Sequence, residues 1–154
     1  MFGGSAAVFE AHRELLESFA GNVFHVGEEA GQGQAMKLLN NFLSATALAA
    51  SSEALALGRA HGLDLSTMLD VVNVYTGRDS ATADKFPNRV LTGTYDTGFH
   101  TRLMAKDVRL FNDVAATVGT SHQVSDAVGA LWNACETALP ASAFSEIWKF
   151  VADA

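Results

Sequence analysis

The sequence contains one cysteine, Cys135, among 154 residues, and it has few basic side chains. A single cysteine excludes an internal disulfide framework and favours a reducing compartment. The 10 lysines and arginines stand against 17 acidic residues, for a net charge of −7, which argues against a general nucleic-acid binder. No run of 18 apolar residues and no basic-then-apolar start occur, so we expect no membrane span, no signal peptide and a cytoplasmic protein.

The remaining composition is that of a globular protein. Apolar residues make up 49% of the chain and charged residues 18%, a balance that disfavours intrinsic disorder. The length favours one domain with at most a small appendage, and it allows a sizeable core without disulfides or metal ions.

Hydrophobic periodicity predicts a mostly helical chain. A helix over residues 5–20 and a short strand over residues 22–26 come first, and we see no second strand of comparable quality. Further helices are predicted over residues 34–61, 65–75, 80–91 and 101–118, then after a Ser121 cap, and last around Trp148. The fold class is therefore all-α, a multi-helix bundle around one long central helix, preceded by one helix–strand unit.

The same periodicity predicts which helix faces are buried and which residues cap the helices. The expected inward residues are Val8, Ala11, Leu15 and Phe19 in the first helix, Leu103, Leu110, Phe111, Val114, Ala115 and Val118 in the 101–118 helix, and Val124, Val128, Leu131 and Cys135 in the next. Asp64 or Ser66 is the expected cap of the 65–75 helix, and Ser142 that of the last helix. Pro87 weakens the continuity of the 80–91 helix.

A short glycine motif, Gly31-Gln32-Gly33, lies between the predicted strand and the long helix. It resembles the start of a dinucleotide-binding loop, and Glu53 follows at a suitable distance. However, Met36 occupies the position of the third glycine, and the helix continues through Glu53. A flexible entry into the helix is the favoured interpretation.

Lys37 and Asn41 share a face near the start of the long helix. A desolvated lysine has a lowered pKa, as a general acid or base requires, and an asparagine beside it could orient a substrate. On spacing alone, a solvated lysine at a helix end with an asparagine beside it is the favoured interpretation.

The other polar groups carry weaker signals. Lys106 falls within the predicted apolar stripe of its helix, which suggests a buried or half-buried ion pair with Asp107. The five histidines have no metal-ligand spacing, so no metal site is predicted. Cys135 lies in an apolar stripe and is expected to be a buried small residue.

Two segments resemble a known family when they are taken in order. Residues 31–41 match the pattern G-x-G-x-x-x-K-x-x-x-N, and residues 99–108 match F-x-x-x-L-x-x-K-D followed by an apolar residue. Both are similar to motifs of the β-hydroxyacid dehydrogenases, the family that includes 3-hydroxyisobutyrate dehydrogenase and is related to 6-phosphogluconate dehydrogenase. The resemblance extends over residues 20–150. It implies that residues 1–27 are the closing helix and strand of a nucleotide-binding domain and that residues 28–154 form the C-terminal helical domain.

The resemblance also implies roles and partners. Lys37 would transfer the proton of a small β-hydroxyacid while its hydride goes to NAD or NADP. Asn41 would bind the substrate, and Lys106 would contact the cofactor. The helical domain of such enzymes usually forms the subunit interface, so a homodimer or higher oligomer is expected, with no nucleic-acid or membrane partner.

One departure from the family pattern matters. The glycine-rich dinucleotide loop and the substrate-binding S-G-G segment of the family have no counterpart in this sequence. We therefore expect the isolated chain to be inactive. Two alternatives stay open, a non-catalytic helical module that only oligomerises and a relative of the imine reductases, although the latter generally replace the lysine.

Overall fold

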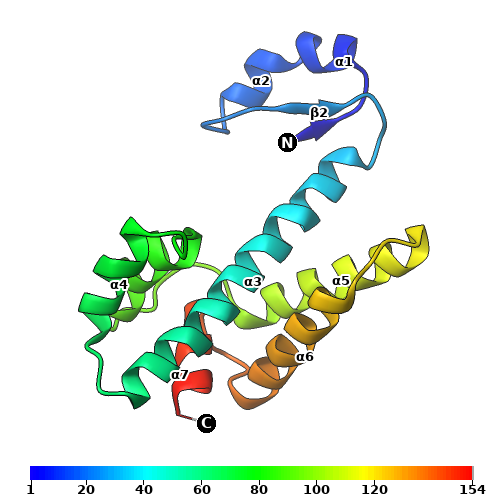
Figure 1. The fold of residues 1–154 in the computed structure, drawn as a ribbon. Coiled ribbons are helices and arrows are strands. Elements are labelled where there is room, and N and C mark those ends of the chain that lie inside the picture. Colours follow the sequence, from blue (N-terminus) through cyan, green and yellow to red (C-terminus); the bar gives the residue numbers. More distant parts are fainter. Residues whose placement is uncertain (154) are drawn as a thin grey trace. The chain divides into compact units, whose positions relative to one another are not determined.

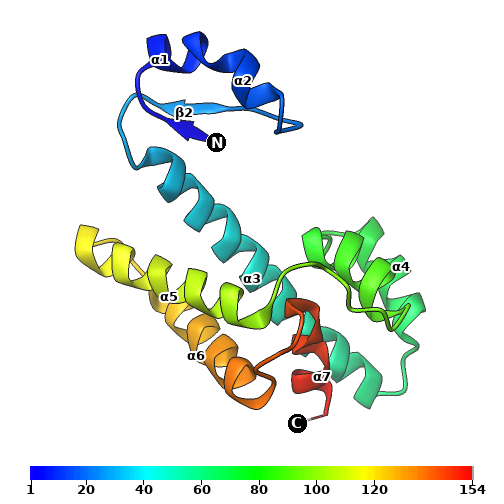
Figure 2. The same cartoon turned by 180° about the vertical axis from the view of Figure 1, so that it is seen from behind.

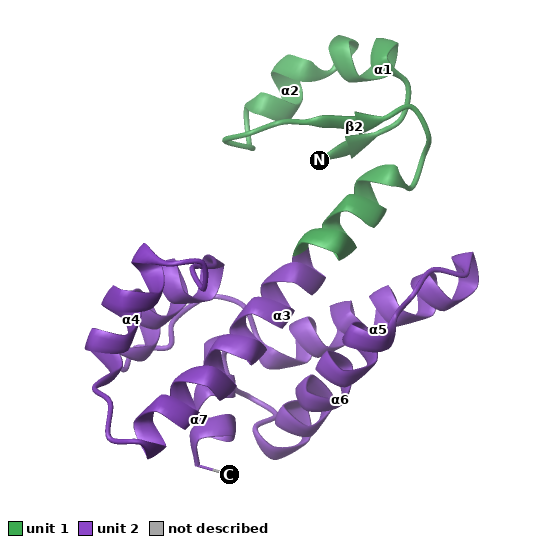
Figure 3. Cartoon of the chain, in the orientation of Figure 1, with its two compact units in different colours: residues 1–40 green, residues 41–154 purple. Residues whose placement is uncertain are grey.

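The chain, described here by a computed structural model over residues 1–153, divides into two compact units. The first comprises residues 1–40 and the second begins at Asn41 (Figure 3). The division falls inside the long helix α3, Gln32–Ala60, which contributes its first turns to one unit and the rest to the other. Helix α3 confirms the long helix predicted over residues 34–61.

The first unit is a small α/β element (Figure 1). Its two strands are parallel, with Phe2 opposite His25 and Gly3 opposite Gly27. The elements before α3 are β1 (Phe2–Gly3), α1 (Ala6–Ala11), α2 (Arg13–Glu17) and β2 (His25–Gly27). The expectation of a single strand was thus wrong, because a two-residue strand is too short to produce a periodic pattern.

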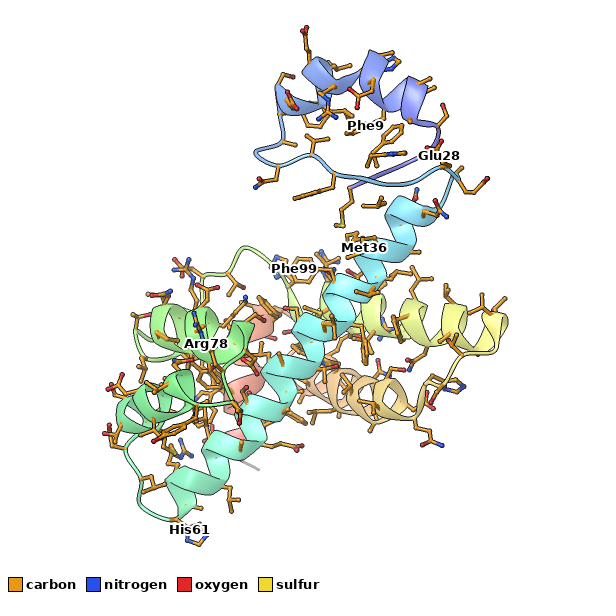
Figure 4. The ribbon with its side chains drawn as sticks, turned by 45° about the horizontal axis from the view of Figure 1, so that its top comes forward. Phe9, Glu28, Met36, His61, Arg78 and Phe99 are labelled. Carbon is orange, nitrogen blue, oxygen red and sulfur yellow. The ribbon has the colours of Figure 1, made fainter. Side chains whose placement is uncertain are left out.

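The predicted helix over residues 5–20 is broken at His12, and its buried face was misassigned. Phe9 is the buried residue, at 3% exposure, whereas Val8, Leu15 and Phe19 are exposed. The Phe9 ring packs against Phe2 and His25 at centroid distances of 5.5 and 5.2 Å, between the helices and the strands (Figure 4). Contact with the strands, rather than helix periodicity, therefore decides which residue is buried.

In the second unit, α3 runs between two helix pairs (Figures 1 and 2). One pair is α4 with η1, and the other is α5 with α6, which pack along each other. The bounds are α4 Leu65–Val74, η1 Ala81–Val90, α5 Thr101–Val118, α6 Gln123–Ala138, η2 Phe144–Glu146 and α7 Ile147–Ala152. The predicted all-α bundle around a long central helix is confirmed. Within residues 1–153, no helix has both the length and the apolar content needed to cross a membrane.

The core of the second unit is centred on Trp132 of α6. Its side chain is fully buried, and its Nε1 donates a hydrogen bond to the Ala45 carbonyl of α3 at 3.2 Å. Ala45, Leu48 and Ala49 are buried on the same helix. Because the two alanines have small side chains, α6 can approach the α3 backbone closely. Leu43 of the same helix is 58% exposed, so α3 is not buried on all sides.

The predicted caps are confirmed in one case of three. Asp64 caps α4, because its carboxylate accepts a hydrogen bond from the Thr67 amide at 2.8 Å. Helix α6 is preceded by His122, with no side-chain cap bond, so Ser121 is not the cap. Ser142 is not the cap of the last helix, and its Oγ instead forms a hydrogen bond of 2.5 Å with Thr101 Oγ1.

The bounds of α5 agree with the prediction, but its predicted inward face is rotated by about one residue. Leu110, Val114 and Val118 are exposed, at 43%, 40% and 65%. The buried residues of α5 are Thr101, Met104, Ala105, Asp107, Val108 and Ala115, of which only Ala115 belongs to the predicted face. In α6 the predicted inward face is largely confirmed, since Cys135 is buried and the half-buried Val128 and Leu131 pack against the core, whereas Val124 is 62% exposed. Pro87 lies inside η1, whose wider π-helical turns include a Leu91 amide to Phe86 carbonyl bond of 2.9 Å.

A close backbone contact in the first unit explains two glycines. A Cβ atom on Gly3 would lie 2.6 Å from the Gly33 nitrogen and 2.9 Å from the Glu29 carbonyl oxygen. Real Cβ atoms do not approach backbone atoms this closely, so β1 and the first turn of α3 can touch only through glycine. Of the two glycines in the 31–41 motif, Gly33 is thus explained by this packing.

We predict that Gly3→Ala destabilises the chain by about 1–3 kcal/mol, because the backbone atoms it would meet cannot move aside easily. Gly21→Ala is the matched control, since a Cβ there meets nothing within 4 Å. Urea unfolding of both variants measures the difference. Equal stability of the two variants would contradict the packing role of Gly3.

Candidate functional site

Lys37 lies in the second turn of α3 and lines a cavity in the first unit. The cavity has a volume of about 350 Å³ and is bordered by Met1, Phe2, Gly3, Gly33, Gln34 and Lys37. The Lys37 side chain is exposed in this chain. A small polar molecule therefore has access to the ammonium group from the start of α3.

Asn41, four residues after Lys37 on α3, is bonded to a buried carboxylate of α5. Its Nδ2 donates a hydrogen bond to Asp107 Oδ2 at 2.6 Å. The Asp107 side chain is only 3% exposed, and Asn41 is half-buried. A bond from an amide to a buried, charged acceptor is a strong one, worth about 1.5–3 kcal/mol.

The second oxygen of Asp107 holds the neighbouring lysine. Lys106 Nζ lies 2.7 Å from Asp107 Oδ1, and its side chain is 57% exposed. The predicted half-buried ion pair is confirmed, with one correction. Lys106 lies outside the buried stripe and Asp107 within it, because the inward face of α5 is rotated from the one predicted.

Two contacts hold α5 in the register that places Asp107 inward. At its start, the Thr101 amide donates to the Ser142 carbonyl at 3.0 Å. Further along, Phe111 stacks on Phe42 of α3 with a centroid distance of 4.3 Å. Asp107 lies between these two contacts in sequence, so the rotation of α5 is fixed before and after it.

The structure thus joins Asn41 and Lys106 through Asp107, and it places Lys37 one turn earlier on α3 than Asn41. Sequence reasoning named the other three residues but gave Asp107 no role in the site. The available signal was its position, since Asp107 lies three residues after Met104 and next to Val108, both buried.

Other candidate chemistry is not supported. Burial raises the pKa of the Cys135 thiol to about 11, so it is almost entirely protonated at neutral pH and is a poor nucleophile. Across residues 1–153, no three side chains of the kinds that bind metals lie together. His25 stacks on Phe9, and its Nε2 lies 2.7 Å from the Gly4 carbonyl oxygen, which fits a structural histidine.

Comparison with known proteins decides the family. Residues 31–151 match the family model described as NAD-binding of NADP-dependent 3-hydroxyisobutyrate dehydrogenase. This match includes Asn41, Lys106 and Asp107. The chain belongs to this dehydrogenase family. The resemblance seen in the sequence motifs is therefore confirmed, and NAD or NADP is the cofactor of the family.

Curated relatives agree with this assignment. Mouse mitochondrial 3-hydroxyisobutyrate dehydrogenase is 38% identical over 127 residues, 78% of this chain and 37% of the relative. In Pseudomonas aeruginosa, a 3-hydroxyisobutyrate dehydrogenase is 36% identical over 84% of this chain and 44% of its own length. An NAD-dependent L-serine dehydrogenase of the same organism is 34% identical over 79% of this chain and 42% of its own. The chain spans less than half of the length of these relatives.

Solved structures show the same fold. A Mycobacterium tuberculosis 3-hydroxyisobutyrate dehydrogenase with L-serine has a TM-score of 0.88 and 26% identity, and the match covers 97% of this chain and 53% of that one. The protein Psf3, in complex with NADP⁺ and 2-OPP, has a TM-score of 0.80 and 25% identity, with 97% and 52% covered.

The residues of this chain fit one part of a dehydrogenase site. A cavity of about 350 Å³ is at the small end of ligand sites and suits a small hydroxyacid or one ring of a cofactor. Glycine at positions 3 and 33 leaves backbone exposed beside the positive end of the α3 dipole. A whole dinucleotide needs more volume, so these residues would hold only its reactive end.

We predict that Asn41→Asp destabilises the chain by about 2–4 kcal/mol, because it sets a second carboxylate against the buried Asp107. One of the two acids would then have a raised pKa, so the folded form would bind more protons than the unfolded form. The loss of stability should grow between pH 5 and pH 8.

Asn88→Asp is the matched control, since Asn88 also donates to a carboxylate, that of Asp84, on the exposed surface of η1 at 3.0 Å. Urea unfolding at both pH values compares the variants with the unmodified chain. A similarly small loss of stability in Asn41→Asp and Asn88→Asp would show that the Asn41–Asp107 bond is not a buried, charged one.

Proposed function

We propose that this chain supplies the helical domain of an NAD(P)-dependent dehydrogenase that oxidises a small β-hydroxyacid. The observation that carries the proposal is the cluster in which Asp107 and Lys106 of α5 meet Asn41 of α3, the helix that also bears Lys37. Relatives named for L-serine, 3-hydroxyisobutyrate and 2-(hydroxymethyl)glutarate support the substrate class. All three compounds are carboxylic acids with a hydroxyl group on the β-carbon.

Lys37 is the proposed general base. Its Nζ would take the proton of the substrate hydroxyl as the C–H hydride leaves, so that the alcohol becomes an aldehyde acid. Bound nicotinamide would supply the acceptor for that hydride. A lysine must be neutral to act as a base, and neutrality requires desolvation. Because Lys37 is exposed in this chain, we expect other parts of the complete enzyme to cover it.

The two remaining residues would bind rather than react. Asn41 would hydrogen-bond the substrate, since its amide is held on α3 one turn after Lys37. Lys106 would contact the cofactor, because its side chain is anchored at Asp107 while remaining 57% exposed. A cation in this position suits the phosphates of a dinucleotide.

An apolar surface of the second unit supports assembly into homo-oligomers. A cavity of about 710 Å³ lies along α3 and α4, and its border includes Leu57, Leu63 and Val71, which are 52–64% exposed. Exposed apolar surface of this kind is typical of protein–protein contacts. We propose that a second copy of the chain covers it.

We predict that Lys37→Ala abolishes turnover, lowering kcat by about 10³-fold or more, while the affinity for the cofactor stays within a few-fold. The measurement uses a chimera in which residues 28–154 replace the helical domain of the P. aeruginosa 3-hydroxyisobutyrate dehydrogenase, which is 36% identical. Oxidation of 3-hydroxyisobutyrate and of L-serine is followed by nicotinamide absorbance.

Lys85→Ala is the control, since Lys85 lies on η1 and forms a salt bridge with the adjacent Asp84. It should leave kcat within about twofold. Full turnover by the Lys37→Ala chimera would refute the assigned role.

The isolated 154-residue chain should show no NAD(P)-dependent oxidation of β-hydroxyacids, because it has no glycine-rich dinucleotide loop. Activity assays, a dinucleotide titration and light scattering on the same sample test this expectation. Measurable turnover would contradict it. If the chimera is inactive while the isolated chain forms oligomers, the alternative of a non-catalytic helical module that only oligomerises is favoured.

A further inference from the structure

Asp107 is a buried carboxylate to which the proposed reaction gives no step. Its side chain is 3% exposed, yet both of its oxygens have polar partners, Oδ2 with Asn41 Nδ2 and Oδ1 with Lys106 Nζ. Burying a carboxylate is costly unless such partners compensate it. A role in the site would explain why a costly buried carboxylate lies between two candidate site residues.

The bond to Asp107 determines which way the Asn41 amide faces. An ionised carboxylate only accepts hydrogen bonds, so the amide must turn its Nδ2 toward Asp107 and its Oδ1 away. A neutral partner that both donates and accepts would allow either orientation. The negative charge of Asp107, more than its shape, is therefore what selects one orientation.

We propose that Asp107 is a positioning residue that holds the Asn41 amide in one orientation, so that the substrate meets Oδ1 and not a flipped amide. This inference rests on the proposed function, because it assumes that Asn41 binds the substrate. Asp107 itself touches neither substrate nor cofactor in this account. Lys106 shares the same carboxylate through its other oxygen, so that two binding groups on α3 and α5 have one anchor.

The substitution Asp107→Asn tests the orientation directly. It keeps the size of the side chain and its hydrogen-bonding capacity, but it removes the charge that selects Nδ2. Asp113→Asn is the matched control, because Asp113 is an exposed residue of the same helix and the change in net charge is identical.

The first measurement is NMR of the Asn41 side-chain amide in the 154-residue chain, assigned by its loss in Asn41→Ala. Asp107→Asn should shift the two amide proton signals, whereas Asp113→Asn and Lys106→Met should leave them in place. In the unmodified chain, acid titration should move the Asp107 Cγ and Asn41 amide signals with one shared midpoint. Separate midpoints, or no shift in Asp107→Asn, would overturn the proposal, and the titration itself is measured on the unmodified chain.

The second measurement is a double-mutant cycle in the chimeric dehydrogenase. Asp107→Asn should lower kcat/KM by about 10- to 100-fold, as misplacement of a binding group does. The same change in an Asn41→Ala background should cost less than about threefold, because there is no amide left to orient. Asp113→Asn should leave kcat/KM unchanged, and equal losses from Asp107→Asn in both backgrounds would overturn positioning through Asn41.

The two measurements separate this inference from the function on which it rests. An NMR response together with a chimera that oxidises no hydroxyacid would refute the proposed function and retain the orientation of Asn41 by Asp107. An active chimera whose cycle shows additive losses would retain the function and refute the positioning role.

Discussion

The hydrogen bond from the Trp132 indole to the Ala45 carbonyl is the contact on which the helical unit is built. The indole is fully buried, so its N–H needs an acceptor inside the core. An α-helix offers a carbonyl to an outside donor only where no large side chain stands in the way. The alanines of α3 meet this requirement, and α6 is thereby placed against α3, with α5 packed along α6.

The polar cluster follows from this packing. Because α5 lies along α6, its inward face carries Asp107 toward α3, where the carboxylate accepts a hydrogen bond from Asn41. The Asp107 carboxylate then binds Asn41 of α3 and Lys106 of α5, and the Lys106 side chain stays largely exposed. Core packing and the candidate chemistry are thus linked at one side chain, since moving α5 by a single residue would separate Asn41 from its acceptor.

The extent of the long elements could be predicted from the sequence because helix bounds depend on local signals. Helix α5 begins at Thr101 and ends at Val118 as the pattern indicated. Its buried face could not be predicted as well, since Leu110 and Val118 are apolar but lie on the exposed side. Strand β1 has only two residues and depends on β2 for its hydrogen bonds, so no local signal marks it. The role of Asp107 required the tertiary partner Asn41, 66 residues earlier.

The adjacent pair Lys106 and Asp107 also marks the register of its helix. Neighbouring residues on an α-helix point about 100° apart, so one of the pair lies inside and the other in solvent only at a single rotation of α5. A one-residue insertion between Thr101 and Lys106 would bring the ammonium into the buried position of Asp107 and carry the carboxylate to that of Val108, away from Asn41. Residues 92–98 precede the helix and do not set its rotation. Related chains should therefore vary in length there and keep the spacing from Thr101 to Asp107 constant.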